Sequence, residues 1–156
     1  MPERLHRLDE TFIYFPIYFV TASTHTHRRI LSDPDVHNRF IQFAEEGESH
    51  GAWIGAYVLM PDHLHLFVVV DDERLELSTW MKSLKNALSK IFRSKDIPAP
   101  HWQKGFFDHV LRNEESYAEK WEYVRDNPVR AELVKKWRDW PFAGEIFDLE
   151  YRRGAA

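Results

Sequence analysis

The chain has no cysteine among its 156 residues. Disulfide bonds and thiolate chemistry are therefore excluded, and a reducing compartment is the natural setting. No apolar run reaches the length that spans a membrane, and no apolar stretch follows a basic one near the first residue. We therefore expect a cytoplasmic protein with neither a signal peptide nor a membrane partner.

An excess of positive charge is also missing. The formal net charge is −4, whereas domains that coat nucleic acid are usually basic. The local distribution of charge matters more than the total, because it is what meets a phosphate. Residues 80–95 are basic without an acidic member, and they follow an acidic stretch at 71–76. This segment could bind phosphates, or it could be a helix whose charges complement its own dipole.

The composition is that of a globular protein, with 44% hydrophobic and 15% aromatic residues. A chain of this size buries about 68–70% of its unfolded surface, which is enough for a substantial core. No repeat, linker or second compositional region divides it. We therefore expect a single domain over residues 1–156.

Runs of β-branched and aromatic residues predict four strands. They are residues 11–23, with Pro16 at a bulge or edge, 52–60, 63–70 and 102–111. Pro61 and Asp62 form a turn between the second and third strands, which should pair as a hairpin.

Apolar residues at helical spacing predict the helices. The first begins at Pro34 behind the N-cap Asp33, with Gly47 and Gly51 as stop signals. The others are residues 74–94, a helix capped by Asn113 with Glu114 and Glu115 in its first turn and ended by Pro128, and a short helix from 128 to about 136. Residues 137–156 show weak periodicity and no element is predicted there.

The resulting order, β-α-β-β-α-β-α, is that of the split βαβ, ferredoxin-like fold of the α+β class. Its antiparallel sheet would carry helices on one face. The other face would be left for a site, and an added C-terminal helix would carry Tyr123.

His63 and His65 are separated by one residue on a predicted strand. Successive side chains of a strand alternate between faces, so both imidazoles should point to the same side. Two neutral imidazoles so placed can reach one divalent metal ion. The alternative is a pair of half-buried, hydrogen-bonded histidines with a structural role. A second pair of the same spacing, His25 and His27, lies in a polar loop beside two arginines, and we interpret it as solvated.

The helix before Pro128 has two distinct sides. At about 100° of rotation per residue, Tyr117, Trp121 and Val124 form a core stripe. Tyr123 and Asn127 are four residues apart and lie to one side of that stripe. Tyr123 can therefore present its hydroxyl to a cleft, or it can be an amphipathic surface tyrosine. Asn127 can likewise act in a site or as the N-cap of the short helix.

Three motifs in this order resemble a known family. They are His63-Leu64-His65 after the sequence MPD, then WQKGFFDHVLR, then YVRDNPVRAELV. Together they resemble the single-tyrosine HUH transposases, in which HUH denotes His-hydrophobic-His, and most closely the REP-associated tyrosine transposase branch. The resemblance covers about residues 12–142.

The resemblance implies a function and a set of site residues. Tyr123 matches the catalytic tyrosine, and His63, His65 and Asn127 match the metal ligands. The family cuts and rejoins single-stranded DNA, often at a hairpin, through a covalent 5′-phosphotyrosine. A divalent ion would polarise the phosphate, since a phenol is a poor nucleophile at neutral pH. Two histidines favour Mn²⁺ over Mg²⁺, which prefers oxygen ligands, but either metal is plausible. A homodimer is also possible.

Phosphate contacts are expected from basic residues outside the apolar stripes. The predicted DNA-binding residues are Lys82, Lys85, Lys90 and Arg93, followed by Arg28, Arg29, Arg125 and Arg130. Trp102 and Phe106 could provide stacking surfaces for bases, or they could belong to the core. Ala143 and Gly144 stand where relatives often carry two serines, which puts DNA contacts from this tail in doubt.

Two rival functions remain open. The first is a non-catalytic module that binds single-stranded nucleic acid on the same fold. It predicts a strand motif with paired aromatic residues, which the sequence lacks. The second is a metal-dependent phosphodiesterase that uses water as the nucleophile, and it predicts that no protein–DNA adduct forms.

Overall fold

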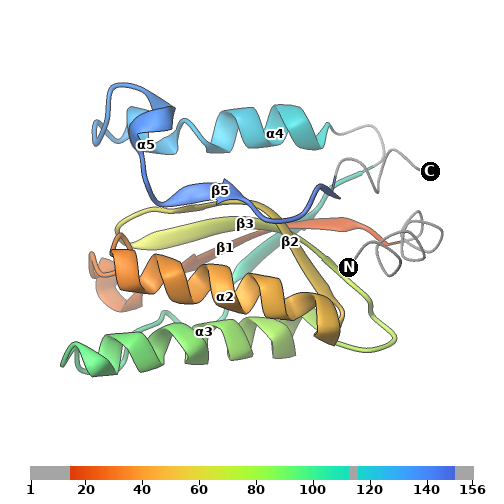
Figure 1. Cartoon of the computed structure of the whole chain (residues 1–156), viewed down its shortest axis with the longest axis horizontal. Coiled ribbons are helices and arrows are strands. Elements are labelled where there is room, and N and C mark those ends of the chain that lie inside the picture. The colour runs from red at the N-terminus through yellow and green to blue at the C-terminus, as the bar shows by residue number, and fades with distance from the viewer. Residues whose placement is uncertain (1–14, 113–115, 150–156) are drawn as a thin grey trace.

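In the computed structural model, one antiparallel sheet separates two groups of helices (Figure 1). The structure describes residues 15–112 and 116–149. The strands are β1 (Ile17–Ser23), β2 (Ala52–Leu59), β3 (His63–Val70), β4 (Phe107–Val110) and β5 (Ala143–Glu145). The helices are α2 (Pro34–His50), α3 (Leu77–Ser94), α4 (Tyr117–Val124) and α5 (Asn127–Arg130), and the 3-10 turns are η1 (His25–His27) and η2 (Trp137–Asp139). No helix within the described ranges is long and apolar enough to cross a membrane.

The strand order in the sheet is β4-β1-β3-β2-β5. Every neighbouring pair is antiparallel, including the predicted β2–β3 hairpin. This arrangement confirms the α+β, ferredoxin-like fold that the element order predicted. The additional strand β5 comes from the segment that had no prediction, and it pairs with β2 through Ala143–Glu145.

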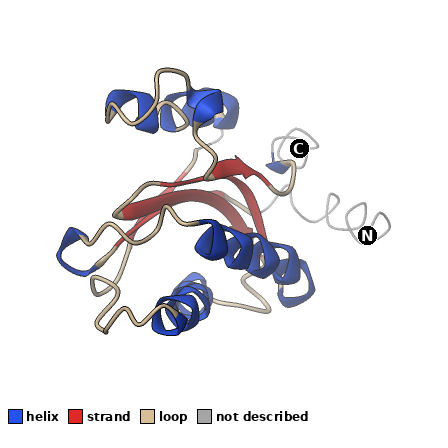
Figure 2. Cartoon of the chain, turned by 60° about the vertical axis from the view of Figure 1, so that its left-hand side comes forward, coloured by secondary structure: helices blue, strands red, loops and turns tan. Residues whose placement is uncertain are grey.

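Helices α2 and α3 cover one face of the sheet and enclose the larger core (Figure 2). Their apolar stripes pack against alternate residues of the strands, including Leu64 and Leu66, which are fully buried. Asp33 caps α2 as predicted, because its Oδ2 accepts hydrogen bonds from the backbone N–H groups of Asp35 and Val36. Gly51 ends this helix at a positive φ of 94°.

As predicted, α2 and α3 leave the second face of the sheet uncovered, but the added tyrosine-bearing helix packs on part of it. Helix α4 lies on that side in Figure 1 and packs on a second apolar cluster. Tyr117 and Val124 are buried in the cluster, and Trp121 packs against its edge. The predicted core stripe of this helix is therefore confirmed, and the face offers a partly covered cleft.

Several predicted boundaries differ from the structure. Strand β1 begins at Ile17, just after Pro16, and residues 11–14 lie outside the described residues. Gly47 does not stop α2, since it lies inside the helix where a Cβ would come within 2.7 Å of the Ala52 carbonyl oxygen. The strand predicted over 102–111 is reduced to β4, because Gly105 adopts a positive φ of 76° between Trp102 and the ladder.

The region of the predicted tyrosine helix also needs correction. Helix α4 begins at Tyr117 behind Ser116, whose side chain accepts from the backbone N–H of Glu119. The predicted cap Asn113 and its neighbours Glu114 and Glu115 lie outside the described residues. The helix ends at Val124, earlier than predicted, and α5 ends at Arg130 without reaching residue 136. Asn127 is the first residue of α5 and Asp126 precedes it as the cap, so the prediction of Asn127 as N-cap is wrong.

One contact fixes α4 to the sheet. The Tyr117 hydroxyl accepts a hydrogen bond of 2.7 Å from the Ala56 N–H and donates one of 3.0 Å to Glu145 Oε2. Burial, and then the charge of Glu145, raises the pKa of this phenol, so it stays protonated and can donate. Gly55 allows the approach, because a Cβ there would lie 2.5 Å from the Tyr117 hydroxyl. The position of α4 therefore depends on a glycine of β2.

We expect Gly55→Ala to lower the free energy of unfolding by about 1–3 kcal/mol, because the added methyl overpacks this contact. Tyr117→Phe removes the hydroxyl that the methyl would meet. We therefore expect the double variant to lose less free energy of unfolding than the two single variants lose in total. Denaturant unfolding of all three variants measures this. Additive costs would place the strain elsewhere, for example against Leu149.

Candidate active site

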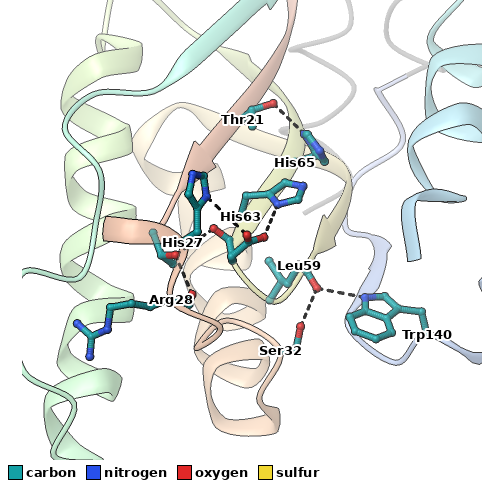
Figure 3. Close-up of polar contacts among 10 residues, drawn as sticks. Thr21, His27, Arg28, Ser32, Leu59, His63, His65 and Trp140 are labelled. Atoms are coloured by element: carbon teal, nitrogen blue, oxygen red, sulfur yellow. Dashed lines mark hydrogen bonds and ion pairs between the residues drawn. The ribbon is translucent and has the colours of Figure 1, made fainter. Parts of the chain in front are cut away.

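His63 and His65 project from β3 toward the face that α4 covers. Leu64 and Leu66 point into the opposite core, which confirms that the two imidazoles share a face. Their ring centroids are 4.8 Å apart and their planes are nearly perpendicular, at 79°. Figure 3 shows the two side chains next to each other at this end of the sheet.

Each imidazole is held through its Nδ1 atom. His63 Nδ1 lies 2.8 Å from Asp62 Oδ1, and His65 Nδ1 lies 2.8 Å from Thr21 Oγ1 (Figure 3). When Nδ1 carries the proton, it donates to these oxygens and leaves the Nε2 lone pair to bind an electrophile. A metal-binding histidine is usually oriented in this way, by a carboxylate or another oxygen on its second nitrogen. The pair therefore fits a divalent cation.

The protonation state of His65 also favours metal binding. Burial, followed by the nearby His63 and Arg130, lowers the pKa of His65 to about 4. Its imidazole is therefore neutral at neutral pH, as a metal ligand must be. Burial would raise the pKa of the Asp62 carboxyl, but the hydrogen bond and charge of His63 outweigh it and the pKa is lowered. Asp62 is therefore an anionic acceptor, and it also lies 3.6 Å from His27 Nδ1.

We expect His65 to make the fold sensitive to acid. Between pH 6.5 and about 4, the unfolded chain protonates this imidazole and the folded chain does not. The free energy of unfolding should therefore fall as the pH is lowered through this window, by on the order of 3 kcal/mol.

Denaturant unfolding at pH 7, 5.5 and 4.5 measures this effect. His65→Gln should flatten the pH dependence, whereas the matched control His25→Gln, at an exposed position, should leave it as in the original chain. An unchanged slope in His65→Gln would assign the acid sensitivity to other groups.

Tyr123 lies near the end of α4 with its side chain exposed, at 67% of its accessible surface. The Arg130 guanidinium stacks over its ring, with Cζ 4.0 Å from the ring centroid. Arg130 Nη2 also donates a hydrogen bond to Asn127 Oδ1. Arg130 thus joins the two residues that the sequence placed on one side of this helix.

A pocket of about 630 Å³ separates α4 from the sheet. The sheet contributes Phe19, His65 and Phe67 to its lining. The segment from α4 to α5 contributes Ser116, Glu119, Lys120, Tyr123, Val124 and Asn127. The structure therefore brings Tyr123, His65 and Asn127 to one cavity, with His63 directly beside His65.

The donor set around a metal would be incomplete without Asn127. Within residues 15–112 and 116–149, no group of three His, Cys, Asp or Glu side chains is placed to hold a metal ion. His63 and His65 therefore need the Asn127 amide oxygen, water or a substrate oxygen to complete a coordination shell. This oxygen already accepts from Arg130, but a carbonyl oxygen has a second lone pair.

Most of the predicted DNA-binding residues lie away from this pocket. Lys82, Lys90 and Arg93 are exposed on α3, which covers the opposite face of the sheet. Lys85 donates to the carbonyl oxygens of Gln103 and Gly105. Of the predicted DNA-binding residues, Arg130 contacts two residues of the pocket, Tyr123 and Asn127. Lys120, which was not predicted, belongs to the lining.

The remaining cations and aromatics have local partners or lie exposed. Arg28 donates to the carbonyl oxygens of Pro98 and Pro100. Arg125 stacks on Trp137 at 4.1 Å, and Arg29 is exposed. Trp102 and Phe106 pack against the larger core, so the structure favours the core interpretation for both. The other pair of histidines, His25 and His27, is exposed in η1.

Sequence reasoning missed the residues that support and line this site. Asp62 was assigned only to a turn, and Thr21 only to a strand, although they hold the two histidines. The register that places Thr21 opposite His65 could have revealed the second contact. Phe19 and Glu119 line the pocket, but no local pattern distinguishes them from ordinary strand and helix residues.

Comparison with known proteins gives consistent matches. The model of the family described as "Transposase IS200 like" matches residues 14–127. A REP-associated tyrosine transposase of Escherichia coli K12 is 30% identical over 101 residues, which is 65% of this chain and 58% of that protein. A Haemophilus influenzae protein, named as a candidate of the same kind, is 24% identical over 105 residues, or 61% of this chain and 60% of that protein.

The chain thus spans about three fifths of the length of these curated relatives. Among solved structures, a REP-associated tyrosine transposase bound to a REP hairpin superposes with a TM-score of 0.67. The identity is 22%, and the match covers 90% of this chain and 82% of the other. At this identity the superposition supports the fold. The sequence matches confirm the family resemblance of the three motifs.

Proposed function

The chain belongs to the IS200-like transposase family, and we propose that it cuts and rejoins single-stranded DNA through a covalent bond between Tyr123 and a 5′ phosphate. The observation that carries the proposal is the common pocket of Tyr123, His65 and Asn127. The exposed hydroxyl-bearing ring and a neutral imidazole meet there, with a cation stacked over the ring.

The reaction is a transesterification. The Tyr123 oxygen attacks phosphorus, the bond from phosphorus to the 3′ oxygen breaks, and a 3′ hydroxyl leaves with a proton. The number of phosphoester bonds is unchanged, so the reverse attack by a 3′ hydroxyl rejoins the strand without an external energy source. Because the tyrosine and His65 line the pocket of one chain, we propose that cleavage takes place within a single subunit.

His63, His65 and Asn127 would hold a divalent ion, Mg²⁺ or Mn²⁺. Such an ion supplies charge that stabilises the developing negative charge on the phosphate oxygens. Asp62 and Thr21 hold the two imidazoles through their Nδ1 atoms, which would leave both Nε2 atoms to the ion. Arg130 places a permanent positive charge beside Tyr123, where it can pair with a phosphate oxygen.

The substrate we propose is a single strand that carries a hairpin, because a related transposase has been solved with a REP hairpin. Arg130 is the phosphate contact that the geometry supports most directly. Lys82, Lys90 and Arg93 would meet DNA only where the strand passes to the α3 side of the sheet. The net charge of −4 predicts modest and salt-sensitive binding.

The test is formation of a covalent adduct. The protein is incubated with labelled hairpin-bearing single strands and Mn²⁺ or Mg²⁺, and the products are separated under denaturing conditions. The expected result is a labelled band that migrates with the protein, together with a free 3′ hydroxyl product. Cleavage without an adduct would support hydrolysis by water, and binding without cleavage would support a non-catalytic module.

A further inference from the structure

The pocket between α4 and the sheet extends well beyond the reacting groups. Ser116, Glu119, Lys120, Tyr123 and Val124 line it at spacings of three and four residues, so they form one continuous helix face. From Ser116 to Val124 this face is about 12 Å long, at 1.5 Å per residue. Tyr123 and Asn127 occupy its C-terminal end only.

The sheet shows the same division. His63, His65 and Phe67 are successive same-face positions of β3, so the lining changes from imidazole to benzene along the strand. Phe67 contacts Tyr117 edge-on, with centroids 4.9 Å apart, which places it beneath the first turn of α4. Phe19 lies opposite Phe67 on β1, with centroids 5.0 Å apart. The histidine end of the sheet therefore faces the tyrosine end of α4, and the two phenylalanines face its beginning.

The sheet side of the phenylalanine end is apolar. Phe19 and Phe67 offer no hydrogen bond there, and the polar part of the lining comes from the start of α4, with Ser116, Glu119 and Lys120. A planar aromatic ligand suits it, because bases of single-stranded nucleic acid stack on aromatic side chains. Phe19 is half-buried and already stacks on one ring, that of His65, at an interplanar angle of 17°. Its ring is thus held in a fixed orientation.

We propose that this end of the pocket binds one unpaired nucleobase next to the scissile phosphate, stacked on Phe19. The inference rests on the proposed function, because the reacting groups determine which nucleotides come near. Such a stack does not require one particular base, because every base has a flat aromatic face.

The experiment measures DNA binding without metal ions, so that cleavage does not contribute. Hairpin-bearing strands are prepared with one abasic site at each single-stranded position in turn, and their affinities are measured by fluorescence anisotropy. We compare Phe19→Leu with the matched control Tyr18→Leu, whose aromatic ring packs on the opposite face of the same strand.

On the intact strand, Phe19→Leu should weaken binding about five-fold or more, the lower limit for one stacked base. At one single-stranded position beside the hairpin (a flank position), the abasic site should itself weaken binding by a similar factor. On that strand, Phe19→Leu should change the affinity less than about two-fold. Tyr18→Leu should show no such coupling at any position. An equal cost of Phe19→Leu on every abasic strand would overturn the proposal.

A second measurement uses the unaltered protein and so does not depend on how the variants fold. The fluorescent base 2-aminopurine, placed at each flank position, should be quenched most at the position that the abasic strands identify. Equal quenching at every flank position would overturn the proposal.

The outcomes separate base binding from the chemistry. If one abasic position is coupled to Phe19→Leu but no covalent adduct forms, the base-binding proposal stands and the proposed tyrosine reaction is wrong. If the adduct forms but no abasic position is coupled to Phe19→Leu, the proposed reaction stands and the base-binding proposal is wrong.

Discussion

Tyr123→Phe should abolish the covalent protein–DNA adduct, with a loss of more than about 10⁴-fold in cleavage. The substitution removes one oxygen atom, which is the proposed nucleophile. The ring remains exposed under the Arg130 guanidinium, so folding and DNA affinity should change little. Denaturing gels with labelled strands measure the adduct, and anisotropy measures the affinity, which we expect within about two-fold of the original chain.

Tyr18→Phe is the matched control for this prediction. Tyr18 is half-buried against the opposite face of the sheet, so loss of its hydroxyl should leave the adduct intact. Tyr117→Phe is a sharper comparison, since this residue shares α4 with Tyr123 but donates to Glu145. It should lower stability while the adduct still forms. An adduct that persists in Tyr123→Phe would assign the nucleophile to another residue.

The element order could be predicted from the sequence because the relevant signals are local. Alternation along β3, the Asp33 cap and the apolar stripe of α4 each depend on residues within a few positions of one another. The strand from the tail, β5, could not be predicted in this way. Its pairing with β2 joins Ala56 to Glu145, and such a distant contact leaves no local period.

The site was predictable in its chemistry but not in its supports. The His-x-His spacing on a strand and the family motifs indicated His63, His65, Tyr123 and Asn127. Thr21 and Gly55 act through register and close approach, which emerge only when the sheet is assembled. The lysines and arginine of α3 were predicted as DNA contacts but lie on the face of the sheet away from the pocket. A basic run in the sequence predicts that its side chains are exposed, but not on which side of the sheet they lie.

His65→Ala should remove the proposed metal site. The variant loses one of two imidazoles that lie 4.8 Å apart, and the remaining ligands are a single histidine and an amide. We expect the affinity for Mn²⁺ to fall by more than about 100-fold, since loss of a mere supporting hydrogen bond already costs 10- to 100-fold. Titration followed by the electron paramagnetic resonance signal of free Mn²⁺ measures this without reference to cleavage.

Asp62→Asn tests the support of His63 separately. The amide can still contact His63 Nδ1 at the present 2.8 Å, but it lacks the carboxylate charge that helps to orient the ring. The Mn²⁺ affinity should fall about 10- to 100-fold, less than in His65→Ala. His25→Ala is the matched control, since it belongs to the exposed pair of identical spacing in η1.

The three variants rank the contributions to the site. If His25→Ala weakens Mn²⁺ binding as much as His65→Ala, the ion binds the exposed pair and the proposed site is wrong. If Asp62→Asn matches the original chain, the contact between Asp62 and His63 does not tune the metal. We expect the loss of Mn²⁺ affinity to be greatest for His65→Ala, smaller for Asp62→Asn and absent for His25→Ala. Because both histidine pairs have the same spacing in the sequence, such a result would show that the metal needs the fixed geometry of β3.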